Sequence, residues 1–178
     1  MTIYLIRHGK TEANERRLYC GSTDLPLSPR GRAELSGTRH EIGNVRFLTS
    51  GMKRADETME LLFPGVPYER EERFREVDFG LFEMRSYDEL KDDPAYQVWI
   101  DGDNQRNVPP GGESGDQMTL RVLAALSELR KDTCLVTHGG VIAAIMAHLF
   151  PNEGKYRYQW QPTNGHGYRI TDTGYEAI

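Results

Sequence analysis

Two histidines stand directly after short apolar runs that are typical of buried strands. His8 follows Ile3–Ile6 and Arg7, and His138 follows Leu135–Thr137. A neutral imidazole nitrogen can attack phosphorus, and the planar fork of an arginine guanidinium matches the geometry of phosphate oxygens. Two strand-end histidines with arginines nearby therefore indicate phosphoryl transfer through a histidine rather than through a metal.

The elements that must position these residues alternate between strand and helix patterns. We expect strands at residues 2–6, 46–49, 133–137 and 167–171, a last short strand after the turn at 172–174, and helices at 29–42, 53–62, 113–129 and 141–149. Tyr156, Tyr158 and Trp160 alternate with polar residues, and this period of two is typical of a strand. Strands that alternate with helices predict a three-layer α/β sandwich with a mostly parallel central sheet.

The middle of the chain, residues 71–112, has no sustained period. It mixes aromatic, acidic and proline residues, with short helices expected at 86–90 and 94–101. We therefore predict a single domain over residues 1–178 that carries a cap-like insertion at about 71–112. The carboxyl ends of parallel strands, where loops lead into helices, are the usual place for a ligand in such a fold.

The composition of the chain bears on which partners the protein binds and in which cellular compartment it works. The chain has 178 residues, of which 38% are hydrophobic and 28% charged, and its net charge of −5 offers no general basic surface for nucleic acid. Its two cysteines define no disulfide framework or metal spacing, which favours a reduced, cytoplasmic setting. We expect no signal peptide, and the longest apolar run, Val141–Phe150, is too short to cross a bilayer.

Five ordered segments carry a family resemblance, and together they span residues 7–141. They are Arg7–Thr11 with Asn14, Gly21 and Asp24–Ser28; Ser50 with Arg54–Thr58; Arg75–Glu83; Pro110–Ser114; and Thr137–Val141. This series resembles the signature of the histidine phosphatase superfamily, in its phosphoglycerate mutase-like branch. The resemblance implies that branch's sandwich fold and a histidine phosphatase activity that uses no metal and no cofactor.

The resemblance and the residue types agree on the roles at the reaction centre. His8 would attack phosphorus and form a phosphohistidine. Arg7 and Arg54 would hold the charged oxygens, and His138, if protonated, would add a further donor. The amides that begin the helix after His138 would add favourable partial charge.

A carboxyl group must also protonate the leaving oxygen and later accept a proton from water. By its match to the acid-bearing segment, Glu76 is the predicted acid and base, with Glu83 second and Asp78 third. Asn14 and Gly21, together with Gly139, complete the predicted phosphate-binding set: Arg7, Arg54, Asn14, Gly21 and Gly139.

Three alternatives stay open beside a phosphatase that hydrolyses a small phosphorylated metabolite. A phosphoglycerate mutase would return the phosphoryl group to a bound sugar acid, but the mutases that resemble this chain have a serine and a tryptophan where Thr11–Asn14 have neither. A non-catalytic protein could bind a phosphorylated ligand without turnover. A metallohydrolase could use the same residue types, although the chain lacks a compact ligand spacing such as HExxH.

The motif style narrows the expected substrate further. The spacing of Thr11–Asn14 and the pattern of Arg75–Tyr87 look like those of the bacterial α-ribazole phosphatases and broad-specificity phosphatases, so α-ribazole phosphate is one candidate substrate. The expected partners are a small phosphorylated substrate, with no nucleic acid and no membrane, and a homodimer is left open.

Overall fold

Six strands form one central sheet in the order β3-β2-β4-β1-β5-β6. The computed structural model describes residues 1–103 and 105–178. The strands are β1 Ile3–Arg7, β2 Arg46–Thr49, β3 Glu69–Arg70, β4 Thr133–Thr137, β5 Gly167–Thr171 and β6 Gly174–Ala177. Strands β3, β2, β4 and β1 pair in parallel, and β5 and β6 extend the sheet in antiparallel fashion. The predicted, mostly parallel sheet is confirmed.

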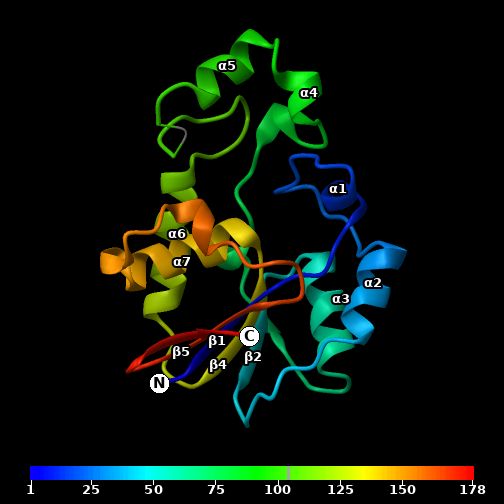
Figure 1. The fold of residues 1–178 in the computed structure, drawn as a ribbon, viewed down its shortest axis with the longest axis vertical. Helices are drawn as coiled ribbons and strands as arrows, with labels where there is room; N and C mark the ends of the chain where they lie inside the picture. Colours follow the sequence, from blue (N-terminus) through cyan, green and yellow to red (C-terminus); the bar gives the residue numbers. More distant parts are fainter. Residues whose placement is uncertain (104) are drawn as a thin grey trace.

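Helices cover both faces of the sheet and make the predicted three layers (Figure 1). Helices α2 (Pro29–Ser36) and α3 (Lys53–Leu62) lie on one side, and α6 (Gly115–Ser127) and α7 (Gly139–Leu149) on the other. In the described part of the chain, no helix combines the length and the apolar character needed to span a bilayer.

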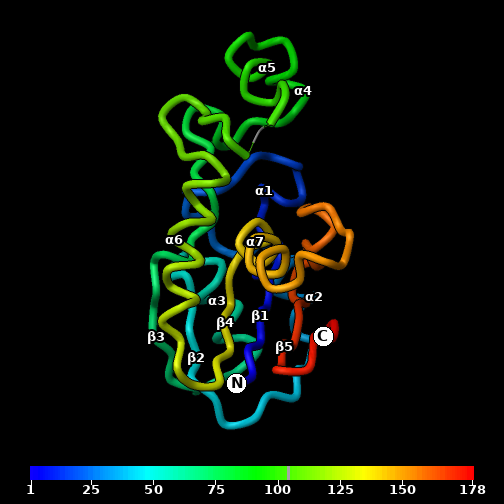
Figure 2. Tube along the Cα trace, turned by 90° about the vertical axis from the view of Figure 1, so that its left-hand side faces the viewer, coloured from blue at the N-terminus to red at the C-terminus, as the bar shows by residue number. Residues whose placement is uncertain are grey.

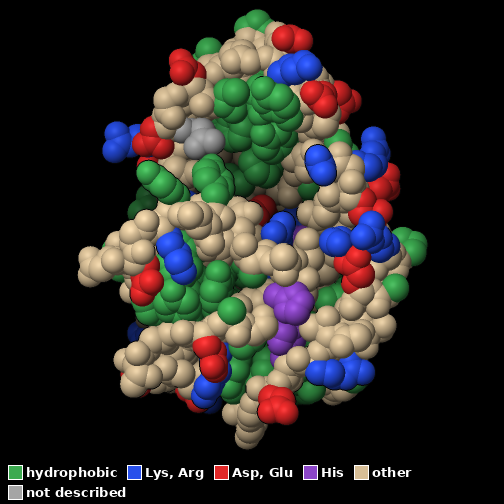
Figure 3. Space-filling model, viewed as in Figure 1, with side chains coloured by type: hydrophobic (Ala, Val, Ile, Leu, Met, Phe, Trp, Pro, Cys, Tyr) green, Lys and Arg blue, Asp and Glu red, His purple; other side chains and the backbone are tan. Residues whose placement is uncertain are grey.

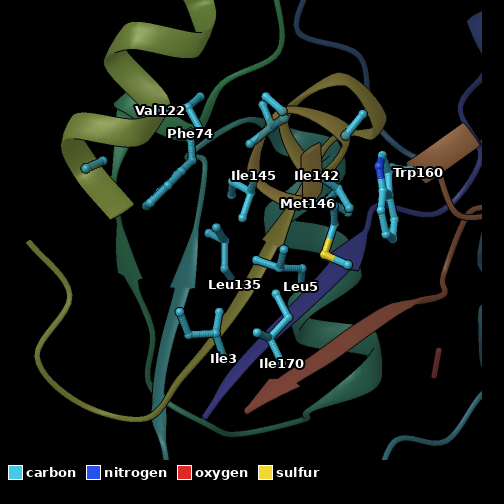
Figure 4. Close-up of a cluster of buried hydrophobic side chains, with 14 of the residues drawn as sticks. Ile3, Leu5, Phe74, Val122, Leu135, Ile142, Ile145, Met146, Trp160 and Ile170 are labelled. Carbon is cyan, nitrogen blue, oxygen red and sulfur yellow. The ribbon is translucent and has the colours of Figure 1, made fainter. Parts of the chain in front are cut away.

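The strands bury alternate residues against these two helix layers. Ile3 and Leu5 of β1 belong to the apolar cluster beneath α6 and α7, whereas Tyr4 and Ile6 belong to the cluster beneath α3. Figure 4 shows strand side chains meeting the side chains of α7, with Trp160 at the edge of the cluster. Because β1 and β4 are apolar on both faces, they can lie only in the middle of a covered sheet.

Helix caps set where two of the predicted helices begin. The hydroxyl of Ser28 accepts a hydrogen bond from the Gly31 amide, and Pro29 begins α2. Ser114 and Gln117 form a capping box, so α6 begins at Gly115, two residues after the predicted start at residue 113. Helix α2 ends at Ser36, six residues before the predicted end at residue 42.

The strand expected around Tyr156–Trp160 is wrong. Residues Arg157–Trp160 form a short 3₁₀ helix, η4, which follows another, η3 (Pro151–Glu153). Trp160 is buried, but Tyr156 and Tyr158 are 81% and 59% exposed, so the three aromatic residues share no buried face. Their alternation in sequence therefore does not mark one buried face of a strand: one ring packs in the core and the other two face solvent.

The middle segment projects beyond the ends of the strands (Figure 2). We call residues 78–103 and 105–112 the cap; it contains η2 (Gly80–Phe82), α4 (Tyr87–Leu90) and α5 (Pro94–Ile100). The cap has an apolar cluster of its own, built on Phe82, Leu90, Tyr96 and Trp99. The preceding turn, η1 (Glu72–Phe74), packs instead into the main core through Phe74.

We expect that the main core depends on Leu135 of β4, which is fully buried in the cluster beneath α6 and α7. Leu135→Ala should lower the free energy of unfolding by about 2–5 kcal/mol, because it leaves a cavity between packed layers. Leu120→Ala is the matched control; Leu120 is 72% exposed on α6, and its truncation should change stability by less than about 0.5 kcal/mol. Urea denaturation of the two variants measures the difference, and equal losses would contradict this description of the core.

Candidate active site

The pairing of β1 with β4 brings the two predicted histidines together. The strands are parallel neighbours, with Arg7 opposite Thr137, so His8 and His138 leave the sheet side by side. Their ring centroids lie 5.1 Å apart, which is close to the spacing of adjacent strands. After β1 the chain runs to the layer of α2 and α3, and after β4 it enters α7 on the opposite face. The pair thus lies where connections diverge to the two faces, the usual ligand crevice of an α/β sheet.

The backbone of the first strand end fixes the tautomer of His8. Its Nδ1 lies 2.7 Å from the carbonyl oxygen of Gly9. A carbonyl can only accept, so Nδ1 carries the proton and Nε2 keeps its lone pair. Burial, and after it the charge of Arg54, lowers the pKa of His8 well below its ordinary value of 6.5. The imidazole is therefore held neutral, in the form that can attack an electrophile.

Arg54 is buried, with only 1% of its surface exposed, and is oriented by a loop rather than by a carboxylate. Its two terminal nitrogens donate to the carbonyls of Gly21, at 2.7 Å, and Thr23, at 2.8 Å. Its Nε donates to Nδ1 of His138, at 3.3 Å. Because all three acceptors are neutral, the positive charge remains available to an anion beside the histidines.

His138 is held as a neutral ring between Arg54 and Ser50. Since Arg54 can only donate, Nδ1 of His138 is an acceptor, and Nε2 carries the proton toward the Ser50 hydroxyl at 2.8 Å. Burial first, and the charge of Arg54 second, lower the pKa of His138 well below 6.5. The protonated His138 considered from sequence is therefore not the form that these contacts favour.

Arg7 offers a further hydrogen-bond donor close to His8. Its Nη1 donates to the carbonyl of Pro162 at 2.8 Å, whereas its Nε is buried and has no hydrogen-bond partner within the described residues. Burial lowers the pKa of Arg7, and the nearby Glu76 carboxylate opposes that effect. A buried N–H without a partner is costly, so an anion that accepts from it would be stabilised.

Glu76 lies against the first turn of α7. One carboxylate oxygen accepts from the Gly140 amide at 2.9 Å, and the other accepts from the Val77 amide at 3.0 Å. A Cβ at residue 140 would stand 2.3 Å from that carboxylate, so glycine is required for this approach. The helix amide expected to face phosphate thus supports the predicted acid instead.

The other two candidate acids have structural contacts. Glu83 accepts from the amides of Gly21, Ser22, Thr23 and Phe79 and from the Thr23 hydroxyl. It therefore shapes the loop whose carbonyls orient Arg54. Asp78 accepts from the Ser22 hydroxyl and the Gly80 amide. Of the three candidate acids, only Glu76 lines the cavity beneath the cap, and its role as the acid stays a prediction.

The remaining predicted phosphate-binding residues, Asn14, Gly21 and Gly139, have different kinds of contact. The side-chain oxygen of Asn14 accepts from the Thr11 amide and hydroxyl, in a capping box that begins α1 (Glu12–Glu15). Gly21 contributes its carbonyl to Arg54, and a Cβ there would collide with the carbonyl oxygen of Val77 at 1.6 Å. Gly139 lies against the Arg7 guanidinium. Direct phosphate contacts by these three residues stay predictions.

Sequence reasoning missed Asn164, which supports His8 from the far end of the chain. The amide of Asn164 donates to the His8 carbonyl at 2.8 Å, and the Gly165 amide donates to the Arg7 carbonyl at 2.9 Å. A polar residue in a turn carries no signal of this contact, because only the folded sheet places β5 beside β1.

The face shown in Figure 3 is hollowed between the cap and the sheet layers, with acidic and basic side chains at the base of the hollow and apolar ones above it. A cavity of about 400 Å³ lies between Glu76 and Gly140 on one side and cap residues Phe79, Trp99 and Ile100 on the other. A separate cavity of about 510 Å³ is lined by Arg7 but not by Glu76. We take the first as the candidate reaction cavity because it contains the carboxylate.

Comparison with known proteins agrees with this geometry. Residues 3–177 match the family described as the histidine phosphatase superfamily (branch 1). The adenosylcobalamin/alpha-ribazole phosphatase of Escherichia coli (strain K12) is 31% identical over 173 residues, which cover 89% of this chain and 85% of that protein. Its namesake in Salmonella typhimurium is 32% identical over 161 residues, covering 84% and 79%.

A solved structure extends the likeness to the whole chain. The crystal structure of a phosphoglycerate mutase from Thermus thermophilus superposes with a TM-score of 0.79 at 29% identity, covering 100% of this chain and 96% of that one. With its paired strand-end histidines, its buried arginine and a family match over nearly its full length, this chain belongs to the histidine phosphatase superfamily, branch 1.

Proposed function

We propose that this protein is a phosphomonoesterase that hydrolyses a small phosphorylated metabolite through a phosphohistidine on His8, without a metal. The observation that carries the proposal is the state of that ring. Its Nδ1–H is committed to the Gly9 carbonyl, so Nε2 has a lone pair beside the charge of Arg54. A neutral nucleophile next to a fixed guanidinium suits attack on a charged phosphate.

The first step of the proposed cycle transfers the phosphoryl group to the enzyme. Nε2 of His8 attacks phosphorus as the bond to the leaving oxygen breaks, and a protonated Glu76 gives its proton to that oxygen. Arg54 and the unpartnered Nε of Arg7 would hold the equatorial oxygens as negative charge spreads over them. Preorganised donors of this kind cost no reorganisation during the reaction.

The second step releases phosphate and restores the enzyme. Water attacks the phosphohistidine in line with the bond to Nε2, and the Glu76 carboxylate takes the proton from that water. The nitrogen–phosphorus bond breaks, and the electron pair returns to His8. The hydrogen bonds from Gly140 and Val77 support this role, since they keep the same carboxylate in place for both steps.

Hydrolysis is favoured over mutase chemistry by the segment after the first histidine. Thr11 and Asn14 form the capping box of α1, and the serine and tryptophan of the similar mutases are absent from this segment. A binding protein without turnover is disfavoured because His8 lies beside His138, which contacts Arg54, and because the Glu76 carboxylate is close enough to Arg7 to oppose the lowering of its pKa. The names of two relatives suggest α-ribazole phosphate as a substrate to include in any test.

The decisive experiment measures phosphate release from a panel of phosphorylated metabolites. His8→Ala should lower kcat by about 1000-fold or more, because the covalent route is lost. Wild-type enzyme that is quenched at alkaline pH during turnover should carry a phosphohistidine, which mass spectrometry can detect. His148→Ala is the control, since His148 is exposed near the end of α7 and should keep full activity. Full turnover by His8→Ala would disprove the proposal. If α-ribazole phosphate reacts no faster than generic esters, only that substrate assignment is wrong and the proposed phosphatase activity stands.

We expect Glu76→Gln to act most strongly on esters with poor leaving groups. It should lower kcat/KM for alkyl phosphates by about 100-fold or more, but for 4-nitrophenyl phosphate by less than about tenfold, because a stable leaving anion needs no proton. Glu72→Gln, in an exposed side chain of the same segment, is the control. A loss of equal size for both kinds of ester would remove the acid role.

Acidification should destabilise the protein through the two buried histidines. Their pKa values are lowered in the folded state, so their contribution to stability is intact above the unfolded value of 6.5 and is lost as pH falls from 6.5 toward the folded pKa. Each histidine can add up to about 1.4 kcal/mol per pH unit to this loss. Urea denaturation across this range should show a shallower loss for His138→Gln than for wild type or His148→Ala. Identical slopes would contradict the buried neutral ring.

A further inference from the structure

The cavity beside Glu76 has a second cationic feature that the steps above do not use. Besides Glu76 and Gly140, its walls come from the cap, the start of α6 and the segment after η3. The apolar part of the wall includes Tyr19, Phe79, Trp99, Ile100 and Met118. Arg157, the first residue of η4, is the one lysine or arginine that lines the cavity in the described part of the chain.

The two carboxylates that line the cavity have partners, but Arg157 has no carboxylate partner. Glu113 forms an ion pair with Arg121, and Glu76 accepts from two backbone amides. Within the described residues, Arg157 forms no ion pair; its Nη1 donates to the side-chain oxygen of Gln105. The guanidinium is therefore oriented by a neutral amide, and its charge is left uncompensated at contact distance.

The orientation of Arg157 is built into the junction between cap and body. The start of α6 is glycine at residue 115, where a Cβ would stand 2.3 Å from the side-chain oxygen of Gln105. That glycine leaves Gln105 the space to reach Arg157. Burial lowers the pKa of Arg157, and Glu76 is the largest opposing influence. A half-buried cation held in this way is stabilised by an anion that enters the cavity.

The geometry points to a specificity role: we propose that Arg157 binds a second oxyanion, carried on the leaving-group side of the substrate. This inference rests on the proposed function, because Glu76 marks the leaving-group side only if it protonates the leaving oxygen. A carboxylate, a phosphate and a phosphonate each present at least two adjacent charged oxygens, which can accept paired hydrogen bonds from a guanidinium. The proposed substrate is therefore a phosphomonoester whose alcohol part has an apolar region and an anionic end. The apolar region would face the cap, and the anionic end would contact Arg157.

The test compares three esters that differ only in the far end of the leaving group. Phenyl phosphate is neutral there, 4-carboxyphenyl phosphate carries a carboxylate, and 4-(phosphonomethyl)phenyl phosphate carries a phosphonate. Wild-type enzyme should show a higher kcat/KM for at least one anionic ester than for the neutral one. Arg157→Gln should reduce that preference about tenfold or more, the scale of one charge-assisted hydrogen bond.

Two further variants separate charge recognition from a structural role. Arg157→Lys keeps the charge and should retain part of the preference. Arg106→Gln makes the same charge change in the cap, at a side chain that is 79% exposed, and should leave the preference unaltered. If Arg157→Gln slows all three esters equally, Arg157 only supports the fold or Glu76, and the inference is overturned.

The outcomes also distinguish this inference from the proposed function. Hydrolysis of the esters by wild type with no anionic preference overturns the role of Arg157 and leaves the phosphatase in place. Absence of turnover on these esters and on the metabolite panel overturns both. A preference for only one of the two anionic esters identifies which oxyanion the site accepts.

Discussion

The in-register pairing of β1 with β4 is the constraint on which the site depends. Arg7 faces Thr137 across this pair, and each strand then releases one histidine at the same level. A slip of one residue would turn the buried side chains of a strand to the opposite layer, so the two apolar clusters enforce the register. The close approach of the rings is thus set by the packing of the whole sheet, and not by any attraction between the imidazoles themselves.

Neutral acceptors organise the charge in this site. Backbone carbonyls orient Arg54, a carbonyl sets the tautomer of His8, and the Ser50 hydroxyl accepts a hydrogen bond from His138. Burying charge in this way is costly, because a guanidinium without a counter-ion loses its hydration. The same arrangement lowers the pKa of both histidines and keeps them unprotonated near neutral pH. Arg54 thus keeps an unpaired positive charge beside the histidines, in a chain whose net charge is −5.

Most of the architecture follows from local patterns, because apolar strands and capped helices have strong signals. Strands β2 and β4 and helix α3 begin and end where the pattern predicts. The failures have physical reasons: the alternation around Trp160 reflects one buried ring beside two exposed ones, and α2 stops early at a glycine. Contacts such as Asn164 with the His8 carbonyl join residues 156 positions apart, so no local signal could reveal them. The same holds for Gln105, which reaches Arg157 only across the junction of cap and body.

The aromatic cluster of the cap is separate from the cores that support the sheet. Its Trp99 and the adjoining Phe79 form part of the cavity wall, whereas the histidines stand on strands anchored in the other two clusters. Substitutions among the cap aromatics can thus be tolerated without disturbing the register of the sheet, since sites with no shared partners behave additively. Evolution can therefore change substrate preference by replacing the aromatic residues of this wall, provided that it keeps the histidine-bearing strands and Glu83, the cap residue that shapes the loop around Arg54.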